Sequence, residues 1–581
     1  MTGNAYDTPV VIVGGGPAGS AVAVELGLRG IHAVVLEKTT EIDQNNPRGG
    51  NNTMRTLEHY RRWGISDALH RAAVRVGPSG KSLVPSNGER ILYTTGILGE
   101  PMGTFTFDWG RSESQSSHIS AERSASVNQP KALAVLRPRA TELGADYRFG
   151  AEFLTFTEDE SGIDVVYRDL ATGTEKRLRT RYLVGADSSW SAVRKAAGIE
   201  RSGHVDSDVQ AVMPIVRLTE IDNETLFGQL RYRMNGFLMV ANERIVSNAS
   251  PVDERRWRFT MGDYRGAGEP SEEEVLAAGK ALFGKEIGLE VDSFSSYRSH
   301  IRIADRYSKG RVFIAGDACH VFPPAGGHNQ NLGIGDAVNL GWKMAAVLKG
   351  WAGPALLDSY DAERRPEGWR VGMHSFSNAR NTSNARKMLA NHLAGRNIED
   401  LDEEERFALG EKLYRTTYPQ WHAHGVVLDI RYTHSPVIVD DGSEAPEWEE
   451  TEYRPFAKPG HRAPHFWLAE GRALYDAFGP EFTLLALPDA KDEDIAAIET
   501  EFAASAVPLA VLRLDRADIA EAYGAPLVLV RPDQQIAWRG ADAQGIASVA
   551  AIVTGHDTAS VPVFSVDAAH LAYLVAYKNA A

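Results

Sequence analysis

Three glycines near the amino terminus have the spacing of a loop that holds a dinucleotide. Gly14, Gly16 and Gly19 follow an apolar run at residues 10–13 and open a helical pattern at residues 17–29. In this spacing the first glycine allows a tight turn, the second lets the backbone approach a pyrophosphate, and the third lets the helix pack against the strand. The N–H groups and positive dipole end of the helix would then face the phosphates.

The residues around the glycines support the same reading. Pro17 suits the first helical position, where a missing N–H costs little. A second apolar run at residues 32–36 ends at Glu37, which is followed by Lys38. A carboxylate at this spacing can accept hydrogen bonds from ribose hydroxyls and would repel a 2′-phosphate. A glycine-rich turn in an unrelated α/β fold is the alternative, and this motif alone does not choose between FAD and NAD.

A second stretch, at residues 310–343, suggests another part of the same ligand site. Residues 311–315 read as a buried strand, and Gly316 and Asp317 follow at its carboxyl end, where ligands bind in open α/β sheets. A loop rich in proline and glycine comes next, and a long helix is predicted from about Asn331. An aspartate, exposed N–H groups and a helix N-terminus would suit a sugar-like chain and an electron-accepting ring.

These motifs resemble those of the FAD-dependent aromatic hydroxylases, the single-component flavoprotein monooxygenases of the para-hydroxybenzoate and phenol hydroxylase kind. The resemblance covers roughly residues 8–390 and includes a third motif at residues 182–187, which ends in Asp187. It implies that Glu37 binds the adenosine ribose and Asp317 the ribityl chain. It also implies that residues 182–187 contact both FAD and NAD(P)H.

The resemblance assigns further contacts with FAD. Arg48 would reach the pyrophosphate, and Gln129 would hydrogen-bond the ribityl side. The carbonyl of Pro324 would border the isoalloxazine, and the N–H groups of Gln330 and Asn331 would face its pyrimidine edge. The complete set of expected cofactor contacts is Gly14, Gly16, Pro17, Ala18, Gly19, Glu37, Lys38, Arg48, Gln129, Asp187, Gly316, Asp317, Pro324, Gly327, Gln330 and Asn331.

Three positions depart from the family pattern or add to it. Ser188 replaces a glycine after Asp187, which puts the contact with the reductant in question. Asn329 also replaces a glycine, and asparagine tolerates a positive φ better than most residues. His328 would lie near the N1–O2 edge of the flavin, where positive potential stabilises the reduced anionic form. The alternative for His328 is a loop histidine that faces solvent.

The expected fold class is α/β, with several domains. Because the three motifs are far apart in the chain, the Rossmann-like FAD-binding domain is discontinuous, at residues 1–200 and 300–390. A β-sheet substrate domain is inserted at residues 201–299, and a helical connection spans residues 391–440. Residues 441–581 resemble the thioredoxin-like C-terminal domain of the phenol hydroxylase branch. That segment has no cysteine, so we expect packing or dimer contacts there and no thiol–disulfide chemistry.

Composition limits the kinds of partner. The chain has 581 residues and a net charge of −15, so neither nucleic acid nor an anionic membrane is expected as the main partner. No apolar run approaches the roughly 18 residues of a membrane span. The polar start predicts no signal peptide, so the cytoplasm is the expected location. His422 and His424 have no third ligand nearby, so no metal site is expected, and the single cysteine, Cys319, should be a buried, inert thiol.

The resulting functional hypothesis is an FAD-dependent monooxygenase. It would use NADH or NADPH and O2 to hydroxylate a small phenolic or related aromatic substrate through a flavin C4a-hydroperoxide, and a homodimer is one expected assembly. Two alternatives keep the cofactor: Baeyer–Villiger insertion or another oxidation, and a flavin-binding protein without turnover. Polar residues of the inserted sheet could hold the substrate, although an exposed surface role is favoured for each: Arg231, Tyr232, Arg233, Arg298 and His300.

Overall fold

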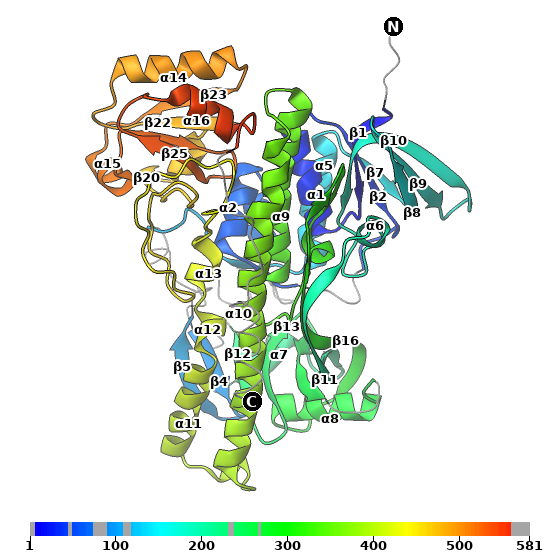
Figure 1. The fold of residues 1–581 in the computed structure, drawn as a ribbon. Coiled ribbons are helices and arrows are strands. Elements are labelled where there is room, and N and C mark those ends of the chain that lie inside the picture. The colour runs from blue at the N-terminus through cyan, green and yellow to red at the C-terminus, as the bar shows by residue number, and fades with distance from the viewer. Residues whose placement is uncertain are drawn as a thin grey trace.

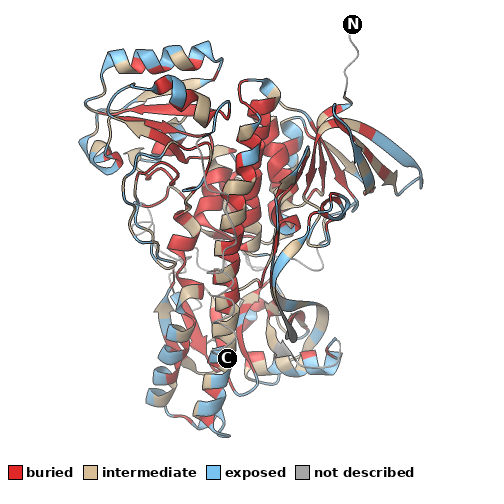
Figure 2. Cartoon of the chain, in the orientation of Figure 1, coloured by how far each residue is buried: buried red, intermediate tan, exposed pale blue. Residues whose placement is uncertain are grey.

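The computed structural model describes residues 6–43, 49–73, 90–107, 118–230, 237–264 and 269–558. Two long helices, α9 (Asn329–Lys349) and α10 (Ala355–Leu393), run through the middle of the molecule. A parallel sheet lies on one side of them, a second sheet lies toward the far end of α10, and the carboxyl-terminal part packs on the opposite side (Figure 1). Helix α9 and the first part of α10 are mostly buried, whereas the far end of α10 is partly exposed (Figure 2).

The first sheet has the strand order β17-β18-β10-β1-β2-β7. Along this order, all pairings are parallel except that of β17 with β18. The antiparallel pair β8 and β9 continues from β10. The strands are β1 (Thr8–Val13), β2 (Ala33–Glu37), β7 (Asp146–Phe149), β8 (Ala151–Glu158), β9 (Ile163–Asp169), β10 (Glu175–Gly185), β17 (Ser308–Lys309) and β18 (Val312–Ile314). Residues 10–13 are at most 5% exposed, as expected for an apolar run covered on both faces.

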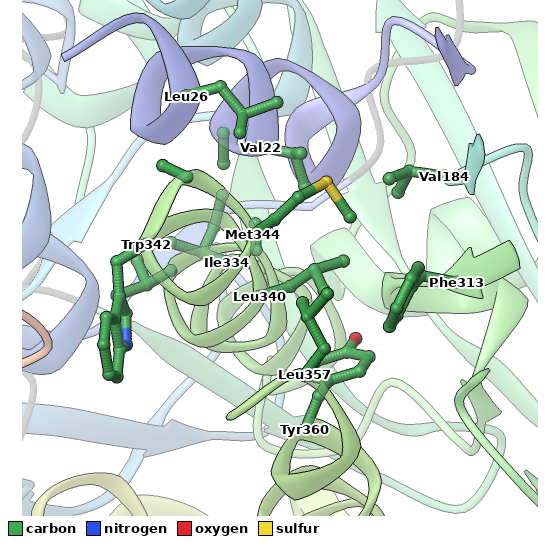
Figure 3. Close-up of a cluster of buried hydrophobic side chains, with 14 of the residues drawn as sticks. Val22, Leu26, Val184, Phe313, Ile334, Leu340, Trp342, Met344, Leu357 and Tyr360 are labelled. Atoms are coloured by element: carbon green, nitrogen blue, oxygen red, sulfur yellow. The ribbon is translucent and has the colours of Figure 1, made fainter. Parts of the chain in front are cut away.

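Helix α9 forms the centre of the main hydrophobic core. Val22 and Leu26 of α1 (Pro17–Gly27) lie on one side of α9, and Leu357 and Tyr360 of α10 lie on the other (Figure 3). Met344 of α9 fills the space between them and is fully buried. Burying a side chain of this size stabilises the fold by roughly 1.5–3 kcal/mol. The core therefore fixes the N-termini of α1 and α9 relative to the first sheet.

The second sheet has the order β19-β16-β11-β14-β13-β12-β4-β5, with β15 beside β11. Its strands are β4 (Arg90–Thr94), β5 (Pro101–Thr106), β11 (Arg201–Leu218), β12 (Leu238–Ala241), β13 (Val246–Pro251), β14 (Arg256–Phe259), β15 (Met261–Tyr264), β16 (Leu289–Ala304) and β19 (His320–Val321). Helix α8 (Glu272–Phe283) packs on it and begins with a capping box between Ser271 and Glu274. Because β4, β5 and β19 belong to it, this sheet reaches beyond residues 201–299.

The carboxyl-terminal part contains a four-stranded sheet of order β23-β22-β24-β25. Strands β22 and β23 are parallel, whereas β24 is antiparallel to both of its neighbours. Its elements are β22 (Phe482–Ala486), α14 (Asp492–Ala504), β23 (Leu509–Arg513), α15 (Ala517–Tyr523), β24 (Leu527–Val530), β25 (Ile536–Gly540) and α16 (Ile546–Val553). It is linked to α10 through α11 (Glu403–Thr416), α12 (Tyr418–Trp421), α13 (His424–Leu428), β20 (Trp467–Ala469) and β21 (Arg472–Ala473). The remaining α-helices and strands of the described residues are α2 (Met54–Arg62), α3 (Ser66–Ala73), α5 (Gln129–Glu142), α6 (Ala192–Ala196), α7 (Asn223–Gly228), β3 (Asn51–Asn52) and β6 (Ala125–Ser126).

Buried ion pairs join this carboxyl-terminal part to the central helices. Arg531, which follows β24, donates to both carboxylate oxygens of Glu363 on α10, at 2.6 and 2.8 Å. Lys343 of α9 donates to the same carboxylate at 2.6 Å, and all three side chains are fully buried. Burial by itself would raise the pKa of Glu363, but Arg531 and Lys343 outweigh it and hold that pKa well below its ordinary value. Within the described ranges, no helix has the length and apolar character needed to cross a membrane.

Candidate cofactor site

The strands that precede the sequence motifs are neighbours in the first sheet. Val13 pairs with Gly185 and with Leu36, and Gly185 pairs with Ile314, all in parallel register. The loops after β1, β10 and β18, together with the end of β2, therefore meet at the carboxyl end of the sheet. This is the end at which open α/β sheets bind ligands.

Close backbone contacts hold these loops together. A Cβ atom added to Gly14, whose φ is +101°, would lie 2.3 Å from the carbonyl oxygen of Ala186. One added to Gly19 would lie 1.9 Å from the carbonyl oxygen of Gly14, and one added to Gly316 would lie 2.9 Å from Cβ of Ala18. Such distances are far inside van der Waals contact, so no larger residue fits at these positions. The structure thus brings the three predicted motifs together.

The space in front of α1 is open. A Cβ added to Gly16 would meet no atom within 4 Å, although its neighbours Gly14 and Gly19 are tightly packed. Gly16 is the N-cap of α1, and no side chain caps the helix; Pro17 is its first residue. The first N–H groups of a helix have no partner within it, so those of α1 face this opening. An uncapped N-terminus beside an open glycine fits the pyrophosphate of a dinucleotide.

Glu37 is held at the end of β2 by hydrogen bonds to its carboxylate. It accepts from the N–H of Gly15 at 2.8 Å and from the N–H and hydroxyl of Thr39 at 2.9 Å each. Its neighbour Lys38 is exposed. Arg137 of α5 donates to the carbonyl of Gly15 at 2.9 Å, and its guanidinium lies 3.6 Å from the Glu37 carboxylate. Arg137 was not among the predicted contacts; it lies about two turns after Gln129 on α5 (Gln129–Glu142).

Asp187 and Ser188 shape the loop after β10. The Asp187 carboxylate accepts from the hydroxyl of Ser191 at 2.5 Å and from the N–H of Val193 at 3.1 Å, at the start of α6. Ser188 has a φ of 73°, in the left-handed region that favours glycine. The glycine that the resemblance implies at this position therefore has a conformational reason, and the serine stores strain there.

Arg201 links the loops after β10 and β18. Its guanidinium donates to the carbonyl of Ser189 at 2.8 Å, to that of Ala318 at 2.8 Å, and also to that of Asp317. Burial lowers the pKa of Arg201 to about 10, and Arg194 adds to the effect. Asp317 itself is exposed at the strand end, which places its carboxylate on the surface of the candidate site. Arg201 was also missed, because its role depends on contacts far away in the sequence.

The loop before α9 differs from the expectation for Asn329. The positive φ values lie at Gly326 and Gly327, whereas Asn329 is the first residue of α9 and donates to the carbonyl of Phe322 at 3.1 Å. The expected positive φ at Asn329 is therefore wrong, and no strain arises there. The N–H of Gly327 donates to the carbonyl of Pro324 at 2.9 Å, which closes the turn.

The first turn of α9 is tied to residues 49–56. The Asn331 side chain accepts from the N–H of Thr53 at 2.9 Å, and Gln330 donates to the side chain of Asn52 at 3.1 Å. A Cβ on Gly49 would lie 3.3 Å from Oε1 of Gln330 and 3.9 Å from Cβ of Gln129. No side chain caps α9, so its first N–H groups are available to an acceptor. Arg48, immediately before this segment, lies outside the described residues.

Of the two expectations for His328, the solvent-facing loop is wrong, and its position near the flavin edge stays a prediction. Only 3% of His328 is exposed, and its ring lies 5.2 Å from that of His374 on α10. Burial, with contributions from His374 and Arg370, holds the pKa of His328 well below its ordinary value, so the ring is neutral near pH 7. It therefore neither faces solvent nor supplies a positive charge.

The remaining predicted residues are placed as follows. Cys319 is buried, as expected, and burial raises the pKa of its thiol well above the ordinary value. On β16, Arg298 is exposed, and burial lowers the pKa of the half-buried His300. The candidates at residues 231–233 (Arg231, Tyr232 and Arg233) lie outside the described residues.

Comparison with known proteins shows to which family the chain belongs. Residues 7–375 match the FAD binding domain family, and residues 457–556 match the family described as aromatic-ring hydroxylase, C-terminal. The chain belongs to the FAD-binding aromatic-ring hydroxylases. This hydroxylase is an FAD-dependent aromatic monooxygenase, and the open dinucleotide site at the ends of β1, β2, β10 and β18 fits that cofactor.

Relatives of this hydroxylase match it over nearly their whole length. It is 31% identical to a 4-methyl-5-nitrocatechol 5-monooxygenase of Burkholderia sp, over 92% of this chain and 94% of that protein. It is 30% identical to a putative polyketide hydroxylase of Streptomyces halstedii, over 92% and 93% of the two chains. The crystal structure of the flavin-dependent monooxygenase PieE with FAD and substrate has a TM-score of 0.81 and 27% identity, covering 95% of this chain and 100% of that chain.

Proposed function

We propose that this hydroxylase uses NADH or NADPH and O2 to hydroxylate a phenolic or related aromatic compound. The observation that carries the proposal is the meeting of three separate motifs at one end of a parallel sheet, around an open and uncapped helix N-terminus. The relatives include a nitrocatechol monooxygenase and a putative polyketide hydroxylase, which supports an aromatic substrate.

The proposed placement of FAD follows the sheet from β2 to α9. Glu37 and Lys38 would hold the adenosine end, and the N-terminus of α1 would hold the pyrophosphate. The remaining proposed contacts are Gly14, Gly16, Pro17, Ala18, Gly19 and Arg48 at the pyrophosphate, Gln129, Gly316 and Asp317 at the ribityl chain, and Pro324, Gly327, Gln330 and Asn331 at the ring. Asp187 belongs to the motif proposed to contact both FAD and NAD(P)H. Arg137 joins this set because its guanidinium lies between Gly15 and Glu37.

The chemistry that bound FAD supplies is acceptance of a hydride from NAD(P)H and activation of O2. The overall reaction consumes the aromatic substrate, O2, NAD(P)H and a proton, and it yields the hydroxylated product, water and NAD(P)⁺. The protein positions the ring and stabilises charge. Because His328 is neutral, we assign the stabilisation of negative charge at the pyrimidine edge to the N–H groups and dipole of α9.

Finer features of the architecture belong to the same proposal. We propose a Rossmann-like cofactor domain and a thioredoxin-like carboxyl-terminal domain, which the order β23-β22-β24-β25 and the antiparallel β24 support. Its sequence holds no cysteine, so a packing or homodimer role is proposed for it. We also propose that the chain divides into domains at residues 1–200 with 300–390, 201–299, 391–440 and 441–581. A cytoplasmic location is part of the same proposal.

The test is coenzyme oxidation by the purified, FAD-loaded enzyme with a panel of phenols. We expect one phenolic class to accelerate oxidation of NADH or NADPH several-fold over the rate without substrate. Reduction of the bound flavin by neither coenzyme, with or without phenols, would contradict the proposal and favour a binding protein without turnover. Failure of the protein to take up FAD would contradict the cofactor site itself.

A further inference from the structure

A fully buried carboxylate lies directly behind the loop after β18. Asp336, about two turns into α9, accepts from the N–H of Gly316 at 3.1 Å and forms a hydrogen bond with Nε2 of His320 at 2.8 Å. Both side chains of this pair are fully buried. Asp336 therefore holds the loop in which Gly316 and Asp317 follow the strand.

Arg364 of α10 ties the same carboxylate to the first turn of α9. Its guanidinium donates from Nε to Asp336 at 2.9 Å and from Nη2 to the carbonyl of Leu332 at 3.1 Å. Its Nη1 donates to the hydroxyl of Tyr432 at 3.1 Å. Gly335 makes room for the guanidinium, since a Cβ added there would lie 2.7 Å from Nη2. One buried ion pair thus connects the loop after β18 with the N-terminal end of α9.

The Asp336 carboxylate is ionised although it is buried. Burial by itself would raise the pKa of Asp336, but His320 and Arg364 outweigh it and hold that pKa below its ordinary value. An ionised carboxylate has two acceptor oxygens, so it can bind the backbone N–H, the imidazole and the guanidinium at once. Hydrogen bonds to a charged group are also stronger than neutral ones. The charge therefore fixes the loop and the helix relative to each other.

We propose that Asp336 is a positioning residue for FAD, which sets the loop proposed to contact the ribityl chain against the helix end proposed to face the ring. The inference rests on the proposed placement of FAD. Asp336 would not touch the cofactor, because it is fully buried behind Gly316. A site that already has its bound geometry spends less of its binding energy on ordering itself, so loss of this tie should weaken binding.

The variant Asp336→Asn tests the proposal. It keeps the shape of the side chain but removes the charge, and its one amide oxygen cannot accept on the Gly316 side and on the Arg364 side at once. Glu363→Gln is the matched control, because Glu363 is an equally buried carboxylate of α10 whose cationic partners are Lys343 and Arg531. For each protein we would measure the melting temperature of the apoprotein, the dissociation constant of FAD by fluorescence titration, and the midpoint potential of the bound flavin.

We expect both variants to melt below the wild type, but only Asp336→Asn to weaken FAD binding, at least tenfold, and to shift the midpoint potential. Wild-type FAD affinity in Asp336→Asn would overturn the inference. Equal weakening in both variants would also overturn it, because general destabilisation would then explain the loss. Failure of the wild type to bind FAD would overturn the proposed cofactor site together with this inference.

Since Asp336→Asn could fail to fold, hydrogen–deuterium exchange of the wild type gives a second test. We expect the amide of Gly316 to exchange slowly in the apoprotein as well as in the FAD-loaded enzyme, because Asp336 already holds it before the cofactor binds. Fast exchange in the apoprotein that becomes slow only with FAD would overturn the inference, since the cofactor would then order the loop.

Discussion

Gly14 and Ala186 are in such close contact that a single methyl group on the glycine would reach to 2.3 Å from the alanine carbonyl oxygen. This contact fixes the loop after β1 against the loop after β10. Two residues further along the chain, a Cβ added to Gly16 would have no neighbour within 4 Å. The first glycine therefore serves the fold, whereas the second leaves room for a ligand.

These two glycines give a matched pair of variants. Gly14→Ala should lower the melting temperature and abolish FAD binding, because the new methyl group meets backbone and φ is +101°. Gly16→Ala should keep the apoprotein's melting temperature and still weaken FAD binding at least tenfold, since its methyl group would occupy the space of the pyrophosphate. Thermal melts of the apoprotein and flavin fluorescence titrations measure the two effects. Wild-type FAD affinity in Gly16→Ala would rule out the proposed pyrophosphate position.

Ser188→Gly tests the strain in the loop after β10. A non-glycine residue in the left-handed region destabilises the folded state by about 1–2 kcal/mol. Glycine offsets part of this gain, because it loses roughly 0.5–1 kcal/mol more chain entropy on folding. We expect a net stabilisation of up to about 1 kcal/mol, measured by denaturant unfolding of the wild type and the variant. Stopped-flow reduction by NADH and NADPH would show whether the serine also slows access of the coenzyme. A destabilised variant would mean that the serine side chain makes a contact worth more than the strain.

Much of the cofactor site could be predicted because its signals are local. The apolar run before Gly14, Pro17 at the first helical position, and Glu37 at the end of the next run each reflect local chain geometry. The strands and helices that these residues predict are present as β1, α1 and β2. The family resemblance predicted that these residues lie close to Asp187 and Asp317. The strand order explains this closeness, because β18, β10, β1 and β2 are neighbours in the sheet.

What the sequence could not reveal depends on distant contacts. Strands β4 and β5 join the second sheet through the pairing of Leu92 with Leu238, which are far apart in the chain. His328 lies in a loop whose composition predicts exposure, yet α10 covers it with His374. In the sequence, nothing distinguishes Arg201 from other charged residues. Its hydrogen bond to the loop after β18 forms only in the folded protein. No local pattern encodes these relations, because tertiary packing decides them.

Loss of Arg531 should weaken the docking of the carboxyl-terminal part. The Arg531→Met variant leaves Asp533 without its buried guanidinium partner and leaves Glu363 paired with Lys343 alone. Removal of one partner of a buried pair typically costs about 3–5 kcal/mol. Denaturant unfolding should show this loss first in the carboxyl-terminal part, so the two parts need distinct probes. Arg516→Gln, in an exposed pair with Asp518, is the control and should unfold like the wild type. A wild-type unfolding midpoint in Arg531→Met would refute the role of this ion pair.

The free energy of unfolding should fall as the pH drops below about 6.5. Burial and four arginines hold the pKa of His59 well below its ordinary value of 6.5. The unfolded chain therefore takes up a proton near pH 6.5 that the folded chain does not, so the free energy of unfolding decreases as pH falls. The limit for one histidine is about 1.4 kcal/mol per pH unit.

The variants His59→Gln and His328→Gln should each reduce this slope, because the pKa of His328 is lowered as well. Urea unfolding at a series of pH values between neutral and mildly acidic would measure it. A wild-type slope in both variants would show that neither histidine is buried in its neutral form.

The most direct test of the account is the fate of molecular oxygen during turnover. The FAD-loaded enzyme would be supplied with NADH or NADPH, ¹⁸O2 and the phenol that most accelerates coenzyme oxidation. We predict one ¹⁸O atom in the product, located by NMR as a new hydroxyl group on the aromatic ring. An ester or lactone oxygen would show Baeyer–Villiger insertion, and an unlabelled phenol with hydrogen peroxide formed would show oxidase activity; either result would contradict aromatic hydroxylation of that phenol.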